Sequence, residues 1–161
     1  MNVITRLSEA GDFGALAELN NRLWNDDTSP APIHWDGAEE YAQYHTPGSE
    51  IVAVCDGQLC GYVSLKTPTK LESNKHVAEL AIGVDSRFRG IGAGRLLLNA
   101  AYDWAKQNGK RKLSLRVLST NTSAIAFYEK CGFLVQGRLI EEFYLNGRYV
   151  DDIFMYKMID E

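Results

Sequence analysis

A run of glycines that follows an apolar segment constrains the fold of this chain more than any other feature. Residues 79–84 have the composition of a buried strand, and Gly90, Gly92 and Gly94 follow in a loop that also holds arginines. Residues 96–101 then have the composition of a helix. Backbone N–H groups at a helix N-terminus are unpaired, and the helix dipole favours negative charge there. Because glycine lets the backbone approach an anion closely, this stretch predicts a strand, a phosphate-binding loop and a helix.

Two familiar glycine motifs do not fit this loop. A dinucleotide-binding fingerprint requires a third glycine at the position of Arg95. A Walker loop requires lysine and then serine or threonine after its last glycine, where this chain has Arg95 and Leu96. Close packing of the strand against the helix is a further explanation, which suits one glycine better than three.

Length and composition indicate one soluble globular domain that spans residues 1–161. The chain has 45% hydrophobic and 24% charged residues, which is ordinary for such a domain. A net charge of −4 argues against broad binding to nucleic acid, which requires a basic surface. We expect no membrane segment and no signal peptide, because the sequence has no apolar run of eighteen residues and no apolar N-terminal segment.

The cysteines and histidines predict neither disulfides nor a metal site. Cys55, Cys60 and Cys131 are odd in number, and their spacing is not that of a zinc site. The three histidines are scattered and form no ligand pattern. Reduced thiols in a cytoplasmic protein are therefore the expectation, without a metal.

The order of predicted elements is β-α-α-β-β-β-α-β-α-β-β, which indicates the α/β class with one mixed sheet and helices on its faces. Ser8 is expected to cap the first helix, and a polar loop is expected at residues 25–35. Asp56-Gly57 and Asn146-Gly147 are strong hairpin signals. Strands are predicted at residues 2–6, 51–55, 59–65, 76–84, 113–117, 133–144 and 149–157.

Two motifs resemble those of the GNAT superfamily of N-acetyltransferases. Residues 89–94 resemble its Gln/Arg-x-x-Gly-x-Gly/Ala loop and begin five residues after Val84. Residues 121–133 resemble its second motif, Asn-x-x-Ala-x-x-x-Tyr-x-x-x-Gly-Phe. The motifs occur in the family's order, and the resemblance covers nearly the whole chain. It implies the acyl-CoA N-acyltransferase fold, a central mixed β-sheet flanked by helices, as a single N-acetyltransferase domain.

The resemblance also implies acetyl-CoA as cosubstrate and assigns residues to it. The strands are expected to splay apart to admit the thioester, with the backbone of Ile82 and Val84 bonded to the pantetheine arm. A backbone N–H near Ile82 is expected to polarise the acetyl carbonyl. Asn121 is expected near the pantetheine and Tyr128 near the thioester sulfur. The residues expected at the pyrophosphate are Arg89, Gly90, Ile91, Gly92, Ala93, Gly94 and Arg95.

The implied chemistry is direct attack of an amine on the thioester, without a covalent enzyme intermediate. Tyr128 is the expected proton donor to the departing thiolate, since a phenol is protonated at neutral pH. Some family members have a glutamate base on the strand before the second motif, where this chain has Arg116. Glu79 is the best remaining carboxylate. The alternative for Glu79, a strand-end carboxylate paired with a lysine, is equally favoured.

The acceptor is expected to be a primary amine, either a small amine or a protein amino group. Aromatic side chains are candidates to contact it: Trp24, Trp35, Tyr144 and Tyr149. Carboxylates of the last hairpin are candidates to attract it: Glu141, Glu142, Asp151 and Asp152. A catalytically silent acyl-CoA sensor is the alternative function, and a longer acyl group is a further one. The edge of the last hairpin also offers a surface for pairing in a homodimer.

Overall fold

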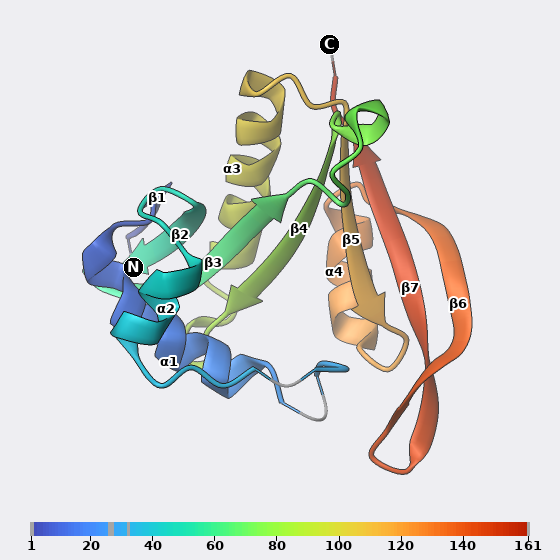
Figure 1. The fold of residues 1–161 in the computed structure, drawn as a ribbon, viewed down its shortest axis with the longest axis horizontal. Coiled ribbons are helices and arrows are strands. Elements are labelled where there is room, and N and C mark those ends of the chain that lie inside the picture. The colour runs from blue at the N-terminus through green and yellow to red at the C-terminus, as the bar shows by residue number, and fades with distance from the viewer. Residues whose placement is uncertain (1, 26–27, 32, 161) are drawn as a thin grey trace.

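The computed structural model describes residues 2–25, 28–31 and 33–160, which form one mixed sheet with helices on both faces (Figure 1). The strands are β1 Val3–Leu7, β2 Glu50–Cys55, β3 Gln58–Lys66, β4 Val77–Val84, β5 Lys112–Leu118, β6 Leu134–Leu145 and β7 Arg148–Met158. The α-helices are α1 Phe13–Leu23, α2 Ala38–Tyr44, α3 Ala93–Gln107 and α4 Thr122–Lys130. Short 3-10 turns are η1 Ala10–Asp12, η2 Glu72–Asn74 and η3 Ser86–Phe88.

The strand order is β1-β2-β3-β4-β5-β7-β6, and the only parallel pair among the described strands is β4 with β5. Parallel neighbours need a crossover, which α3 provides here. The predicted element order and the mixed sheet flanked by helices are therefore confirmed. No helix within the described part of the chain combines the length and apolar character needed to cross a bilayer.

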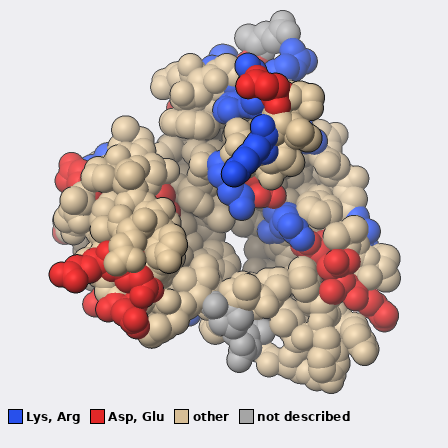
Figure 2. All heavy atoms as spheres, viewed as in Figure 1, with Lys and Arg blue, Asp and Glu red and all other residues tan. Residues whose placement is uncertain are grey.

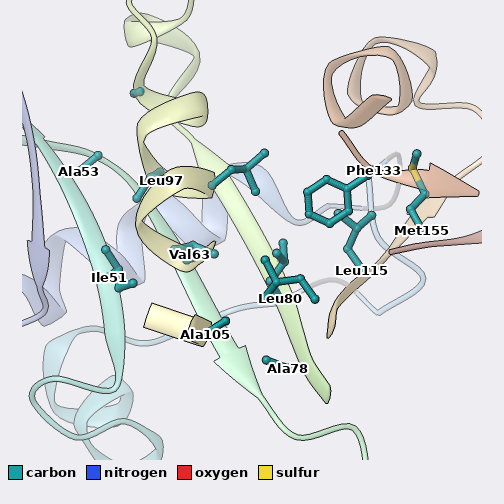
Figure 3. Packing of buried hydrophobic residues seen from close by; sticks show 14 of the residues in the cluster. Ile51, Ala53, Val63, Ala78, Leu80, Leu97, Ala105, Leu115, Phe133 and Met155 are labelled. Carbon is teal, nitrogen blue, oxygen red and sulfur yellow. The ribbon is translucent and has the colours of Figure 1, made fainter. Parts of the chain in front are cut away.

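Alternation along the strands divides the core between the two faces of the sheet. Ile51 and Ala53 of β2 pack with Leu97 of α3, whereas Val52 packs with α1 and α2 on the other face. Figure 3 shows the larger cluster, in which Leu97 lies near Val63, and Phe133 lies beside Leu115 and Met155. Both faces thus hold helices against the sheet.

Two hairpin turns form where the sequence predicts them. Asp56 and Gly57 connect β2 to β3, with φ angles of 49° and 83°. Asn146 and Gly147 connect β6 to β7, with φ angles of 49° and 78°. Two consecutive residues at positive φ match the twist of antiparallel strands, which explains the preference for Asn-Gly and Asp-Gly pairs.

The start of the first helix differs from the expectation. Ser8 does not cap α1; its hydroxyl accepts hydrogen bonds from the N–H groups of Gly48 and Glu50, at 3.2 and 3.3 Å. Main-chain bonds also join Ser8 to both residues, so it ties β1 to the start of β2. Of the predicted loop at residues 25–35, positions 26, 27 and 32 lie outside the described residues.

The central feature of the sheet is the point where β4 and β5 separate. Their pairing ends at Glu79 and Ser114, whereas β4 stays paired with β3 as far as Val84. Figure 1 shows the two strands diverging from this point, and Figure 2 shows a hollow between the two halves of the molecule. The sheet therefore opens between β4 and β5.

Gly61 of β3 pairs with β4 on the side of that strand that stays intact. A substitution at Gly61 tests how tightly this side is packed. A Cβ at Gly61 would lie 2.9 Å from the carbonyl oxygen of Gly83 and 3.0 Å from Leu97 Cδ1. We expect Gly61→Ala to lower the free energy of unfolding in urea by about 1–3 kcal/mol, because the neighbouring backbone must shift. Gly137→Ala on β6 is the control, since nothing lies within 4 Å of its Cβ. Equal effects of both substitutions would contradict this packing.

Candidate active site

The opening exposes main-chain groups of β4. The N–H of Asp85 donates to the Cys60 carbonyl of β3 at 2.8 Å, and the His76 carbonyl accepts from Arg111 on the other side at 2.9 Å. Peptide groups of successive strand residues face opposite neighbours. Those of Ile82 and Val84 therefore face β5, beyond the point where its pairing with β4 ends. The two residues expected at a pantetheine arm thus present their backbone to the opening.

The glycine loop leads into the N-terminus of α3. Gly92, with a φ of 86°, occupies the N-cap position, and its carbonyl accepts the first helical bond from Leu96 N–H at 3.0 Å. The N–H groups of Ala93, Gly94 and Arg95 precede that bond, so the helix itself does not use them. This arrangement fits a phosphate group, because N–H donors and the helix dipole act together.

Asp85 fixes the start of this loop. Its carboxylate accepts hydrogen bonds from the side chain of Arg87, with Nη2 at 2.7 Å from Oδ2, and from Arg22 of α1 at 2.9 Å. These arginine bonds lower the pKa of Asp85 to about 2, despite its burial. Arg87 is therefore engaged in shaping the loop. The sequence-based reasoning missed Asp85, although a lone carboxylate directly after an apolar strand was the available signal.

Of the other residues predicted to form the loop, some pack in the core and others are exposed to solvent. Ala93 is buried, and Ile91 packs against the larger core cluster. Arg89 and Arg95 are exposed, and neither forms an ion pair with another described residue. A Cβ on Gly94 would lie 3.1 Å from Phe127 Cζ, so the helix start lies close to α4. The loop thus offers main-chain donors with two unengaged arginines beside them.

A cavity of about 280 Å³ occupies the mouth of the opening. Its lining comes from the residue that follows α1, from three strands and from α4, which brings together residues far apart in the sequence. Its polar lining residues are Ser64, Lys66, Glu79, Arg116 and Tyr128. Its apolar lining residues are Trp24, Leu80, Ala81, Ile82 and Leu115. Tyr128 and Glu79, the two predicted catalytic residues, therefore share one cavity.

Tyr128 lies on α4 in a largely apolar setting. Its ring is 6.0 Å from that of Phe133 and 5.7 Å from that of Phe127. Burial, with a smaller contribution from Cys131, raises the pKa of Tyr128 to about 12. No described residue forms a hydrogen bond with its hydroxyl. The phenol is therefore protonated at neutral pH and has its hydrogen-bonding capacity available in the cavity.

Glu79 is paired with a lysine, which is one of the two alternatives that the sequence left open. Its Oε2 lies 3.5 Å from Lys66 Nζ, and 22% of its side chain is exposed. It is thus a carboxylate within β4 that lies beside a lysine, and it also lines the cavity. Lys66 was missed from the sequence, because the cross-strand pairing that places it opposite Glu79 is a tertiary feature.

By the resemblance, Arg116 stands at the position where some family members have a glutamate. The structure gives this arginine a fixed hydrogen-bonding partner. Its guanidinium donates through Nε and Nη2 to Oδ2 of Asp152, with Nε at 2.8 Å, and it lies 4.9 Å from the centre of the Phe154 ring. Asp152 is buried, so it is not exposed to attract an amine as expected. Asp151 likewise is bonded to Arg138, at 2.6 Å.

The expected aromatic wall does not assemble. Of its four members only Trp24 lines the cavity. Trp35 packs against Tyr41, at 5.1 Å between ring centroids. Tyr144 and Tyr149 are exposed and contact each other on the β6–β7 hairpin. These rings were chosen by residue type alone, and the register of the hairpin carries two of them away from the opening.

Asn121 caps α4, and its side chain accepts a hydrogen bond from Ala124 N–H at 3.3 Å. It does not line the cavity. The capping role explains an asparagine at this position without a ligand. No cluster of three or more histidine, cysteine or acidic side chains suited to a metal occurs within residues 2–25, 28–31 and 33–160.

The ion pairs of Asp85 give the protein a specific acid sensitivity. The pKa of Asp85 falls to about 2 on folding. The ionised carboxylate therefore contributes fully to the free energy of unfolding above about pH 4, and this contribution is lost as the pH falls towards 2. We expect Asp85→Asn to lower the free energy of unfolding by about 1–2 kcal/mol at pH 6, and by less near pH 2. Asp103→Asn, at an exposed site on α3, is the control. A pH-independent difference in urea titrations would contradict this assignment.

Comparisons with known proteins agree with this arrangement. The family model described as Acetyltransferase (GNAT) family matches residues 16–133. The L-amino acid N-acyltransferase MnaT of Escherichia coli (strain K12) is 28% identical over 97% of this chain and 94% of that enzyme. The spermidine N(1)-acetyltransferase of Vibrio cholerae serotype O1 is 30% identical over 94% of this chain and 90% of that enzyme.

A solved structure shows the same fold. It is yncA of Salmonella typhimurium, described as a putative acetyltransferase with its cofactor acetyl-CoA, and its TM-score is 0.87 at 24% identity. The match covers 100% of this chain and 96% of that one. The family model covers more than half of the chain, and it includes the glycine loop and Tyr128. On these grounds the chain belongs to the GNAT family of acetyltransferases.

Proposed function

We propose that this protein transfers the acetyl group of acetyl-CoA to a primary amine by direct attack. The observation that carries the proposal is the cavity at the β4–β5 opening, where Tyr128 and Glu79 lie beside the exposed backbone of Ile82. Family membership supports the reaction class. Relatives named for amino acids and for spermidine share a primary amine as the acceptor group, which supports the acceptor class.

The residues that we assign to acetyl-CoA fit its chemistry. N–H groups between Gly90 and Arg95 are suited to the pyrophosphate, with Arg89 and Arg95 near enough in sequence to add positive charge. The peptide groups of Ile82 and Val84 are suited to the pantetheine amides, as in strand addition. Asn121 remains a proposed contact beside its capping role. When bound, acetyl-CoA supplies the acetyl group as a thioester.

Proton movements are assigned to Glu79 and Tyr128. Glu79 accepts the proton that the attacking ammonium must lose, directly or through water, because only the neutral amine has a lone pair. The new C–N bond forms before the C–S bond breaks, and the Tyr128 hydroxyl gives its proton to the departing sulfur. The N–H of Ile82 stabilises negative charge on the acetyl oxygen. The acylated nitrogen then loses its second proton, which restores the Tyr128 phenol, and Glu79 releases its proton to solvent, so one turnover releases one proton overall.

The setting of the protein is part of the proposal. We place it in the cytoplasm as a single domain of residues 1–161, and the absence of any disulfide among its three cysteines is consistent with that. β6 is an edge strand whose exposed side chains include Leu134, Val135 and Ile140. Such an edge favours pairing with a second copy, and we propose a homodimer through it.

Tyr128→Phe tests the proton-donor assignment. We expect turnover, followed as release of the coenzyme A thiol with a panel of amines, to fall by about a hundredfold or more. The dissociation constant for acetyl-CoA, measured by calorimetry, should stay within about twofold, because the ring remains. Tyr102→Phe on α3 removes a hydroxyl outside the cavity and serves as the control.

Unchanged turnover in Tyr128→Phe would contradict the donor role. Binding of acetyl-CoA by the unmodified protein, with no transfer to any small amine, peptide N-terminus or lysine, would contradict the proposed reaction. That second result would instead indicate the acyl-CoA sensor.

A further inference from the structure

The side chains at the opening form two rows across the sheet. Lys66, Glu79 and Ser114 are cross-strand partners on β3, β4 and β5. Residues two positions further along each strand share the same face. The next row therefore holds Ser64 and Ala81, which are partners, and Arg116 on β5. Because Ser64 and Ala81 are small, they leave open space between the first row and Arg116.

Arg116 is held in place at the edge of this space. Two of its nitrogens bond to the buried carboxylate of Asp152, and its guanidinium stacks near Phe154. Its remaining nitrogen, Nη1, has no hydrogen bond to any described residue, and about half of the side chain, 48%, is exposed. A guanidinium that is anchored on one side and open on the other is well suited to bind a carboxylate.

The charges in the cavity favour a ligand that carries both signs. Lys66 and Arg116 are cations, and Glu79 is the only carboxylate among the described residues that line the cavity. Basic side chains also border the hollow in Figure 2. An ammonium group can lie at Glu79, but a second ammonium would meet two cations. A polyamine is therefore disfavoured, whereas an amine with an adjacent carboxylate matches the pattern.

Size and shape agree with a small acceptor. The cavity, at about 280 Å³, lies at the lower limit of ligand pockets, which begin near roughly 300 Å³. Glu79 and Arg116 lie on opposite sides of the opening, on β4 and β5, and the side chains of both line the cavity. Trp24 and Leu115 provide apolar surface for a side chain.

We propose that the acceptor is an α-amino acid, whose carboxylate binds Arg116 with help from Lys66, while its amino group lies at Glu79. This inference rests on the proposed acetyl transfer. It makes Arg116 a specificity-determining residue, which replaces the glutamate of other family members with a carboxylate-binding group. The charge pattern, and not the total charge of −4, selects the acceptor.

The test compares acceptors that differ only in the group attached to the carbon that carries the amine. L-leucine, L-leucinamide and isopentylamine carry a carboxylate, a neutral amide and a hydrogen at that position, and the corresponding methionine and phenylalanine sets extend the comparison. We expect kcat/KM to be about tenfold or more higher for the acid than for its amide or amine in at least one set. Spermidine is included and is expected to be a poor acceptor.

Removing Arg116 alone would leave Asp152 buried without its partner, so the variant removes both charges. We expect Arg116→Met with Asp152→Asn to raise KM for the amino acid by about tenfold or more, and to change the amide and amine by less than about twofold. Arg116→Lys should give an intermediate value. Arg138→Met with Asp151→Asn removes a comparable ion pair from the β6–β7 hairpin and is the matched control.

The outcomes separate this inference from the proposed function. Equal use of acids, amides and amines, or a preference for spermidine, would overturn the amino-acid acceptor and leave acetyl transfer intact. Transfer only to a peptide N-terminus or lysine would likewise overturn the amino-acid acceptor, and transfer to no amine of any kind would refute the proposed function. Equilibrium binding, measured with coenzyme A present, then tests the carboxylate site by itself. The site is supported if L-leucine binds more tightly than isopentylamine and loses this advantage in the double variant. Equal binding overturns it.

Discussion

The whole arrangement depends on the loss of main-chain pairing between β4 and β5 after Glu79 and Ser114. One strand, β4, keeps its antiparallel partner β3, while its other edge becomes available. The crossover through α3 places the glycine loop at the end of that same strand. The main-chain N–H groups of Ile82 and Val84, which face the opening, are thereby followed along the chain by the helix-terminal N–H groups of residues 93–95. The candidate site is thus a consequence of the sheet being split at the parallel junction of β4 and β5.

Charged groups around the opening have separate tasks. Asp85 holds Arg22 and Arg87 and so joins α1 to the loop, which leaves Arg89 and Arg95 without ion pairs among the described residues. Asp152 anchors Arg116, and Lys66 lies beside Glu79. Buried carboxylates therefore position arginines, and the more exposed cations Lys66 and Arg116 line the cavity. This division explains how a chain with a net negative charge presents a locally positive site.

Much of the fold could be predicted from the sequence, because the signals were local. Asn146-Gly147 set a turn and the glycine loop set a helix start, as expected. Ser8 was misassigned because its true partners, at the start of β2, are distant in sequence. The pairs Lys66–Glu79 and Arg116–Asp152 likewise arise from cross-strand register, which residue type and spacing do not specify. Tyr128 and Glu79 were predicted individually, but their shared cavity required the fold.

The account is tested most directly by amide NMR during titration with acetyl-CoA. The central claim is that the edge of β4 and the N-terminus of α3 bind the cofactor through their N–H groups. The account predicts the largest ¹H–¹⁵N shift changes at Ile82, Val84 and residues 90–95, with little change along the β6–β7 hairpin. Saturable binding whose largest changes fall on the hairpin, with residues 82–95 unaffected, would contradict it.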